Sequence, residues 1–397
     1  MKKIKRKRKT KLKKIIVIFS ILVLLGITLF GISKLDLNIK IIHNDIELGE
    51  IKEVKWLGNG IFDGYYEKAN KKLQSLTLDE KIGQLLLVSY PSYNQVETLR
   101  KYNFGGYLFF EKDFRYKSLN QAKKMISDLD GVSKIPILTA VDEEGGTVVR
   151  VSTNRSLAPS TFKSPRALYK QGGFDKIRED TINKSKVLSE LGINLNLAPV
   201  VDIASNTWDY MYDRSISGDK EVVANYAKTV VEASMGLGVS YTLKHFPGYG
   251  NNSDTHTGTS VDKRSYESLM NNDIVPFKVG IEAGAEAVMV SHNIVKAIDK
   301  NNPASLSSEI HKLLRGELGF TGVIITDDIA MYAASSVKNP TVKAILAGND
   351  MVITTNYVAS INEIKKALNS GELLEEQIDS LVFRVLAWKY YKGLIND

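Results

Sequence analysis

The sequence predicts an α/β fold, a single (β/α)8 barrel of the TIM type preceded by an N-terminal transmembrane helix and a short stem. Three observations predict it. Short apolar segments alternate with helical stretches along most of the chain, which is typical of a parallel sheet. Polar residues stand where these apolar segments end. An uncharged apolar run follows a strongly basic N-terminus. With 397 residues, 43% of them hydrophobic, the chain can bury a large core.

The N-terminal region is predicted to anchor the chain in a membrane. Residues 1–14 contain ten Lys or Arg and no acidic residue, and residues 15–33 are uncharged and almost wholly apolar. Ile15–Ile32 as a helix is roughly 27 Å long, close to the hydrocarbon thickness of a bilayer. A cleaved signal peptide is the alternative, but no small-residue cleavage site follows Ile32. We therefore expect a single-pass cell-membrane protein.

Charge distribution sets the predicted orientation and excludes one class of partner. The basic tail, residues 1–14, should stay in the cytoplasm, so that residues 15–33 form the anchor, 34–64 an extracellular stem and 65–397 an extracellular domain. Of the 53 basic residues, ten lie in this tail, which leaves 43 against 45 acidic residues. The domain is thus nearly neutral, and a nucleic-acid partner is not expected. The absence of cysteine excludes disulfides, a thiol nucleophile and thiolate metal sites.

The body of the chain begins with two predicted helices and continues as strands alternating with helices. The first helix covers about residues 65–76, and the second begins at Thr77, because Thr77 and Glu80 have capping-box spacing. The eight predicted strands are Leu85–Val88, Tyr107–Phe110, Pro136–Val141, Leu195–Val201, Val239–Leu243, Ala287–Val290, Val323–Thr326 and Met351–Thr354. The helices expected between and after them are Leu119–Leu129, Lys176–Leu191, Val222–Met235, Glu309–Leu318, Ile361–Leu368 and Gln377–Tyr391. Eight such strands fit a closed barrel better than an open doubly wound sheet.

Chemically useful side chains follow five consecutive predicted strands. In chain order they are Asp142, Asp202, Lys244 with His245, His292 and Asp327. Because the carboxyl ends of barrel strands share one face, these residues should ring a single pocket. Asp327 follows the most apolar strand, where a carboxylate is well placed to act as a nucleophile. For His292, a buried and hydrogen-bonded histidine is the equally plausible alternative.

Two connections carry further candidates. Lys244–Ser260 should be an irregular, mobile loop, in which stiffening Gly248 or Gly250 would reduce turnover more than binding. In this loop Asp254 could orient His256 as an acid/base catalyst, although a solvated surface pair is the simpler interpretation. In the connection after the fourth strand, Arg214 could clamp an oxygen-rich ligand, or it could pair with its neighbour Asp213.

Taken together, these motifs are familiar. They are Asp142-x-Glu144-Gly145-Gly146, Lys244-His245-Phe246-Pro247-Gly248, Asp254-x-His256, Ser291-His292 and Thr326-Asp327-Asp328-Ile329-x-Met331. In this order they resemble the β-N-acetylglucosaminidase branch of glycoside hydrolase family 3, over a region from about Leu76 to the end of the chain. Family members often have other residues where Glu143, Thr147, Ile216 and Tyr249 stand, which leaves the leaving-group preference open.

The resemblance implies an exo-acting, retaining β-N-acetylhexosaminidase without metal or cofactor. It further implies Asp327 as nucleophile and His256, oriented by Asp254, as acid/base. Substrate contacts carried over from the family are Asp142, Arg214, Lys244 and His245, with His292 close by. The expected substrates are terminal β-linked N-acetylhexosamine units of cell-wall glycans, including peptidoglycan, or surface glycans, and the ectodomain is expected to be monomeric. A phosphorolytic enzyme and a non-catalytic glycan-binding protein are the alternatives.

Overall fold

The computed structural model describes residues 60–250, 255 and 258–396, all of which belong to one compact unit, Leu57–Asp397. The predicted tail and anchor, residues 1–33, and the predicted stem as far as residue 59 lie outside the described residues. None of the helices that the structure describes is long and apolar enough to span a bilayer. Residues 60–64 pack on the domain, since Phe62 is buried with its ring 5.3 Å from that of Tyr391.

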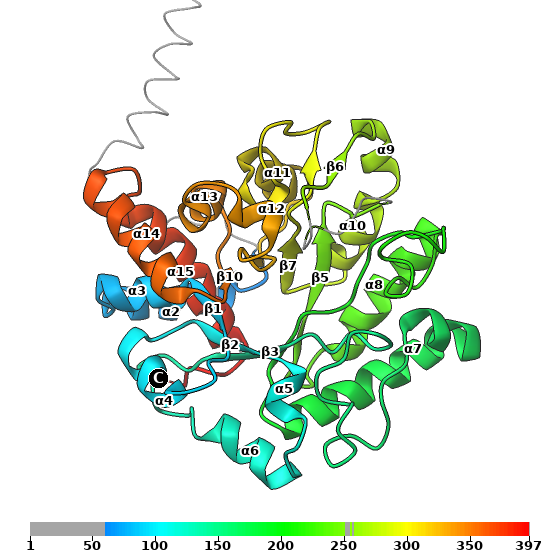
Figure 1. Cartoon of the computed structure of the whole chain (residues 1–397), viewed down its shortest axis with the longest axis horizontal. Coiled ribbons are helices and arrows are strands. Elements are labelled where there is room, and N and C mark those ends of the chain that lie inside the picture. The colour runs from blue at the N-terminus through cyan, green and yellow to red at the C-terminus, as the bar shows by residue number, and fades with distance from the viewer. Residues whose placement is uncertain (1–59, 251–254, 256–257, 397) are drawn as a thin grey trace, which may run out of the picture. The chain divides into compact units, whose positions relative to one another are not determined.

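Eight parallel strands form a nearly closed barrel at the centre of Figure 1. They are β1 (Leu86–Ser89), β2 (Gly106–Phe109), β3 (Leu138–Val141), β4 (Leu195–Asn196), β5 (Ser240–Phe246), β7 (Ala287–Val290), β9 (Val323–Thr326) and β10 (Val352–Thr354). Their order is β10-β1-β2-β3-β4-β5-β7-β9. The outer strands β9 and β10 approach each other at a bridge between Ile325 and Met351. The predicted α/β fold with eight barrel strands is thereby confirmed.

Two of the predicted strands end three or more residues away from their ends in the structure. The fourth ends at Asn196 rather than at Val201, and the fifth extends from Leu243 to Phe246. Pro199 has no N–H with which to continue the ladder of β4. Beyond it, the chain makes only a bridge between Val200 and Lys244. The extension of β5 matters for function, because it places Lys244 and His245 within the last residues of a strand.

Helices cover the outside of the barrel. They are α2 (Tyr66–Gln74), α3 (Leu78–Gln84), α4 (Gln95–Tyr102), α5 (Glu111–Phe114), α6 (Leu119–Ser127), α7 (Pro165–Glu190), α8 (Lys220–Ser234), α9 (Tyr266–Asn271), α10 (Ile274–Glu282), α11 (Ser308–Lys312), α12 (Tyr332–Ser335), α13 (Pro340–Ala347), α14 (Tyr357–Ser370) and α15 (Glu375–Tyr391). The capping box predicted at Thr77 is present at the start of α3. A π-helical segment, Leu313–Glu317, continues α11.

Sequence periodicity missed several of these elements. The range of α7 joins two helical segments across Gly172 and Gly173, whose backbone angles are not helical. The first segment, which begins at Pro165 and is capped by Ser164, was not predicted, whereas the second contains the predicted start at Lys176. The strands β6 (Val261–Asp262) and β8 (Ile294–Val295) form a separate two-stranded parallel sheet. Each is only two residues long, which is too short for an alternating pattern.

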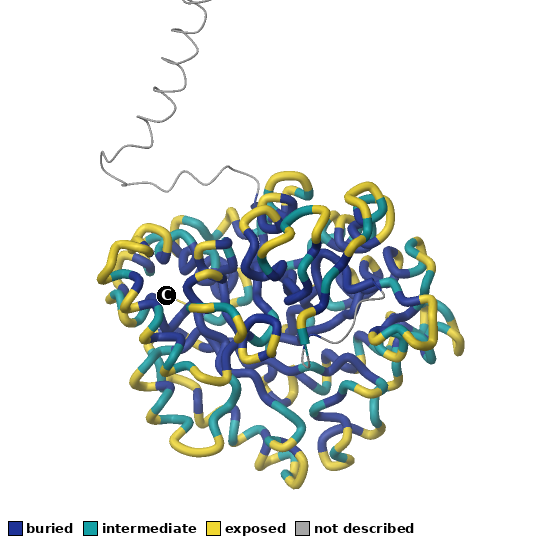
Figure 2. Tube along the Cα trace, turned by 45° about the horizontal axis from the view of Figure 1, so that its top comes forward, coloured by how far each residue is buried: buried dark blue, intermediate teal, exposed yellow. Residues whose placement is uncertain are grey.

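The core lies inside the barrel and between the barrel and its helices, where buried residues dominate in Figure 2. All residues of β2, β3, β5, β7, β9 and β10 are buried. Parallel strands covered on both faces are expected to be apolar throughout. Polar side chains therefore gather where strands end. We call the carboxyl ends of the strands the mouth of the barrel and their amino ends its base.

Candidate active site

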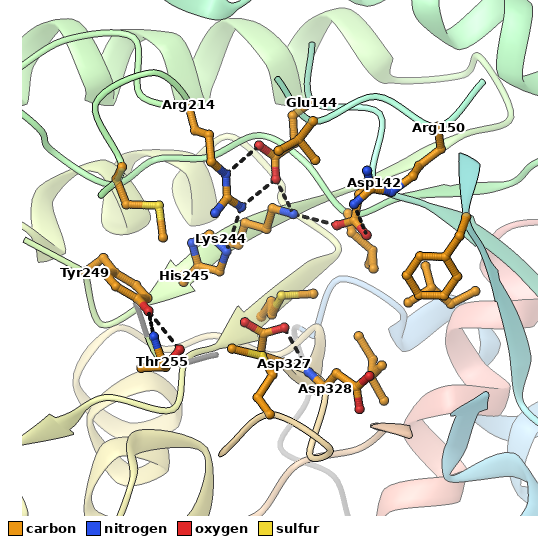
Figure 3. Close-up of a pocket in the computed structure, with 18 of the residues that line it drawn as sticks. Asp142, Glu144, Arg150, Arg214, Lys244, His245, Tyr249, Thr255, Asp327 and Asp328 are labelled. Carbon is orange, nitrogen blue, oxygen red and sulfur yellow. Dashed lines mark hydrogen bonds and ion pairs between the residues drawn. The ribbon is translucent and has the colours of Figure 1, made fainter. Parts of the chain in front are cut away.

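A cavity of about 490 Å³ opens at the mouth of the barrel (Figure 3). Its polar lining residues are Asp142, Glu144, Arg150, Tyr210, Arg214, Lys244, His245, Tyr249, Thr255, Asp327, Asp328 and Thr355. Five residues predicted from the sequence therefore lie around one cavity: Asp142, Arg214, Lys244, His245 and Asp327. Its volume is typical of a site for a small molecule.

A buried ion network forms one wall of this cavity. The Lys244 Nζ lies 2.7 Å from Asp142 Oδ1 and 2.6 Å from Glu144 Oε1. The Arg214 guanidinium donates two hydrogen bonds to Glu144, from Nε to Oε2 at 2.9 Å and from Nη2 to Oε1 at 2.7 Å. Paired charges and a two-point Arg–carboxylate contact hold these side chains in fixed positions. Arg214 therefore pairs with Glu144, far away in sequence, as well as lining the cavity.

This pairing keeps all three charged groups ionised. Burial would raise the pKa of Glu144, but the charges of Arg214 and Lys244 outweigh it and lower that pKa. Burial likewise opposes the charge of Lys244, whereas Asp142 and Glu144 raise its pKa above the ordinary value. The pKa of Arg214 is raised mainly by Glu144 against the effect of burial. The wall thus presents permanent charges and strong hydrogen-bond donors at neutral pH.

His245 is held between a carboxylate and a guanidinium. Its Nδ1 lies 2.7 Å from Asp202 Oδ2, and its Nε2 lies 3.3 Å from Arg214 Nη2. Arg can only donate, so Nε2 accepts and Nδ1 carries the hydrogen that binds Asp202. Asp202 is fully buried and also accepts the backbone N–H of Tyr249 at 2.6 Å. Asp202 thus fixes both the tautomer of His245 and the chain that follows β5.

Asp327 lies across the cavity from the ion network (Figure 3). It follows β9, and its backbone N–H donates to the carbonyl of Val290 at 3.0 Å, which ties it to β7. The Asp328 N–H donates to Asp327 Oδ1 at 2.8 Å. Burial would raise the pKa of Asp327, but the imidazoles of His245 and His292, this N–H and the Lys244 ammonium together lower it. Asp327 is therefore an ionised carboxylate at neutral pH, as a nucleophile must be.

The other predicted site residues lie elsewhere or outside the described residues. His292 is fully buried and does not line the cavity. Its Nδ1 is 2.7 Å from Ser305 Oγ, and its Nε2 is 3.0 Å from the carbonyl oxygen of Asp328, the residue after Asp327. Asp254 and His256 lie outside the described residues. Thr255 between them is described, and it lines the cavity.

Several residues of the site were not among the predicted site residues. Glu144 stands in the sequence as one acid of Asp142-Glu143-Glu144, and nothing local shows that it receives two cations. Arg150 lines the cavity, and its buried Nε has no hydrogen-bond partner among the residues that the structure describes. An Arg in a polar loop carries no signal of its own. In the sequence, Tyr249 was noted only as a position at which family members often have another residue, and it was not predicted to line the cavity. Within the described ranges, no three His, Asp or Glu side chains are grouped as a metal ion requires.

The architecture and the site can now be compared with known proteins. Residues 77–388 match the model of the glycosyl hydrolase family 3 N-terminal domain. The chain belongs to glycosyl hydrolase family 3. This family 3 chain is a glycoside hydrolase, and the matched region contains every strand and every cavity residue described above.

Three similar proteins illustrate the relationship. A beta-hexosaminidase of Xanthomonas campestris pv. campestris (strain B100) is 34% identical over 297 residues, which cover 73% of this chain and 85% of that protein. A family 3 beta-N-acetylglucosaminidase structure from Paenibacillus sp. str. FPU-7 has a TM-score of 0.75 at 30% identity, covering 81% of this chain and 64% of that one. The beta-glucoside phosphorylase BglX has a TM-score of 0.75 at 26% identity, covering 83% and 62%.

Proposed function

We propose that this family 3 enzyme is a membrane-anchored, exo-acting β-N-acetylhexosaminidase. It removes terminal β-linked N-acetylglucosamine from cell-wall or surface glycans with retention of configuration, and its ectodomain is monomeric. The observation that carries the proposal is the placement of an ionised Asp327 across one cavity from a network of fixed hydrogen-bond donors and acceptors. The names of the Xanthomonas and Paenibacillus relatives support the choice of sugar.

In this proposal the ion network binds the hydroxyl groups of the terminal sugar. Asp142 has acceptor capacity left beside its bond to Lys244, and its side chain is 17% exposed, compared with 2% for Lys244. Arg214 and His245 contribute donors from the same wall. Because their partners already fix them, these groups lose little side-chain freedom on binding. The arrangement holds the anomeric carbon toward Asp327.

The reaction proceeds in two displacements. An oxygen of Asp327 forms a bond to the anomeric carbon while the bond to the leaving oxygen breaks, and His256 donates its proton to that oxygen. Water then attacks the same carbon, gives its proton to His256 and releases the Asp327 carboxylate. Two inversions give retention. Asp254 orients His256 in this scheme, and both roles are carried over from the family.

Activity on a chromogenic N-acetyl-β-glucosaminide tests the proposal. The full chain, purified in detergent micelles, is expected to hydrolyse the substrate and to release the β-anomer first, as followed by NMR. The matching galactosaminide reports the preference between the two sugars. No hydrolysis of either hexosaminide would contradict the proposed substrate class.

Phosphorolysis is a second candidate, favoured by the similarity to a beta-glucoside phosphorylase. In that case phosphate instead of water would attack the glycosyl enzyme, and the product would be a sugar 1-phosphate. The assay compares phosphate with a non-nucleophilic buffer at equal ionic strength and identifies the products by mass spectrometry. We expect free N-acetylglucosamine in both buffers. Sugar 1-phosphate as the main product would favour the phosphorylase.

The membrane anchor is proposed from residues 1–33 alone. The ten basic residues followed by an uncharged apolar run support a single span with the enzyme domain outside the cell. The full chain should sediment with membranes and remain there after washing at high pH. Protease added to cells without their wall should degrade the enzyme domain. Release of the chain by the high-pH wash would contradict the anchor.

A further inference from the structure

Tyr249 has an unusual position at the edge of the catalytic cavity. It lies between Gly248, with φ of 115°, and Gly250, with φ of 58°, both in the left-handed region that glycine tolerates. This turn directs a large aromatic side chain inward, so that Tyr249 is only 2% exposed and lines the cavity. Its ring packs edge-on against His245, with centroids 5.7 Å apart. The residue thus contacts a wall that binds the sugar in the proposed function.

Tyr249 also connects two segments through its polar groups. Its backbone N–H donates to Asp202 Oδ1 at 2.6 Å, which fixes it to the segment that follows β4. Its phenol oxygen accepts the backbone N–H of Thr255 at 2.9 Å and lies 2.8 Å from Thr255 Oγ1 (Figure 3). Thr255 is fully buried, and the N–H of Ala333 donates to its carbonyl at 3.4 Å. The phenol is therefore a bridge from the rigid strand ends to Thr255.

The phenol of Tyr249 keeps its proton at neutral pH. Burial is the largest influence and raises the pKa of Tyr249, the bonds with Thr255 partly oppose this rise, and the nearby charge of Asp327 adds to it. A neutral phenol can accept the Thr255 N–H and can either donate to the Thr255 hydroxyl or accept from it. Tyr249, Thr255 and Asp327 all line the same cavity. Tyr249 is thus suited to hold a segment in place beside Asp327.

We propose that Tyr249 is a positioning residue for proton transfer to the leaving group. The inference rests on the proposed function, in which the neighbours of Thr255 in sequence, Asp254 and His256, supply the proton. In this proposal, Tyr249 acts on proton transfer by fixing Thr255 at two atoms. General acid catalysis contributes about 10²–10⁴-fold, and an error of 1 Å in placement can cost about 10²-fold. Tyr249 itself touches no reacting atom in this account.

The test uses leaving groups that differ in their need for a proton. Phenyl N-acetyl-β-glucosaminide has a poor leaving group, whereas the 2,4-dinitrophenyl analogue departs without protonation. In the full-length enzyme, Tyr249→Phe keeps the ring and removes the bridge. We expect its kcat/KM to fall by about 10- to 100-fold with the phenyl substrate and by less than about threefold with the dinitrophenyl substrate. In a plot of kcat/KM against pH for the phenyl substrate, the decrease at high pH that reports deprotonation of the general acid should disappear.

Three further variants control this test. Thr255→Val removes the partner hydroxyl and should show the same selective loss to a smaller extent, while Thr255→Ser retains the hydroxyl and should restore activity. Tyr107→Phe removes a buried phenol that does not line the cavity and that donates to the Gln95 carbonyl oxygen at a distance of 2.9 Å. This variant should leave kcat/KM for both substrates unchanged. Equal losses with both substrates, or no loss in Tyr249→Phe, would overturn the inference alone. A wild-type enzyme inactive on both substrates would overturn the proposed function as well.

Discussion

Lys244 at the mouth of the barrel and Lys389 at its base are both buried, yet their surroundings shift the pKa of the two ammonium groups in opposite directions. Lys244 is held by Asp142 and Glu144, which raise its pKa. Lys389 lies in α15 and donates to Gln84 Oε1 at 2.7 Å, two residues before β1 begins. Among the described residues no carboxylate pairs with it, and burial lowers its pKa to about 7.

This difference in pKa distinguishes buried charges that are compensated and can bind a ligand from a buried charge that lowers the folding stability. Desolvating an ammonium group is expensive unless an anion compensates for it. At the mouth, cations and carboxylates compensate one another and remain ionised, as the proposed contacts with a sugar require. At the base, Lys389 loses its proton near neutral pH. Mouth variants should therefore change catalysis, and base variants should change folding stability.

The largest expected effect comes from Asp327, the proposed nucleophile at the mouth. Asp327→Asn removes the attacking carboxylate but keeps the size of the side chain and its bond from the Asp328 N–H. We expect kcat to fall by at least about 10³-fold, with little change in the thermal midpoint. Kinetics with the dinitrophenyl substrate and a thermal melt measure both quantities. Full turnover by this variant would remove Asp327 from the mechanism.

A buried carboxylate at the base provides the matched comparison. Asp350 precedes β10 and pairs with Arg315 at 2.6 Å and with Arg384. Asp350→Asn leaves two cations without their anion, so the free energy of unfolding should fall by about 3–5 kcal/mol. Urea unfolding gives this value. The folded fraction at low temperature should retain its kcat/KM, and a selective loss of catalysis would break the division between mouth and base.

The pH dependence of stability gives a smaller effect and isolates Lys389. The pKa of Lys389 is about 7 in the folded chain, compared with an ordinary value of 10.5. The loss of folding stability caused by burying its charge is therefore complete below pH 7 and disappears as the pH rises toward 10.5. Lys392, with a pKa lowered to about 8 by burial, acts in the same direction. Each group adds at most about 1.4 kcal/mol of stability per pH unit in its window.

The free energy of unfolding of the wild type, measured in urea, should therefore rise between about pH 7 and pH 9.5. This pH range lies below the one in which tyrosines titrate. In Lys389→Met the rise should be smaller, because only Lys392 still contributes. If the slope of the variant equals that of the wild type, Lys389 is protonated in the folded chain and the contrast with Lys244 does not hold.

The barrel and the location of its cavity could be predicted because the charged residues of the apolar strands stand at or just after their carboxyl ends. Asp142, Lys244 and Asp327 carry that signal in the local sequence. The partner of Arg214 could not be predicted in this way. Its neighbour Asp213 was the local candidate, whereas the structure gives it Glu144. Such a pairing depends on the distance between the ends of different strands, which no local pattern contains.

The two loop glycines show a different limit of sequence reasoning. Gly248 and Gly250 were interpreted as a source of mobility, and that prediction stays untested. The structure gives both a positive φ and close neighbours, since an added Cβ would lie 2.4 Å from Asp273 Cβ or 2.5 Å from Arg264 Cζ. Substituting either glycine would strain the turn itself. A loss of activity would therefore not by itself report on loop motion.

Trapping the glycosyl enzyme tests the central claim most directly. A 2-acetamido-5-fluoro-β-glucosaminyl fluoride should form the covalent bond quickly and release it slowly, because fluorine disfavours both oxocarbenium-like transition states while fluoride leaves readily. Peptide mass spectrometry of the trapped wild-type enzyme should place one N-acetylhexosaminyl adduct on Asp327, and Asp327→Asn should give none. An adduct on another residue, or the same adduct in the variant, would contradict the mechanism.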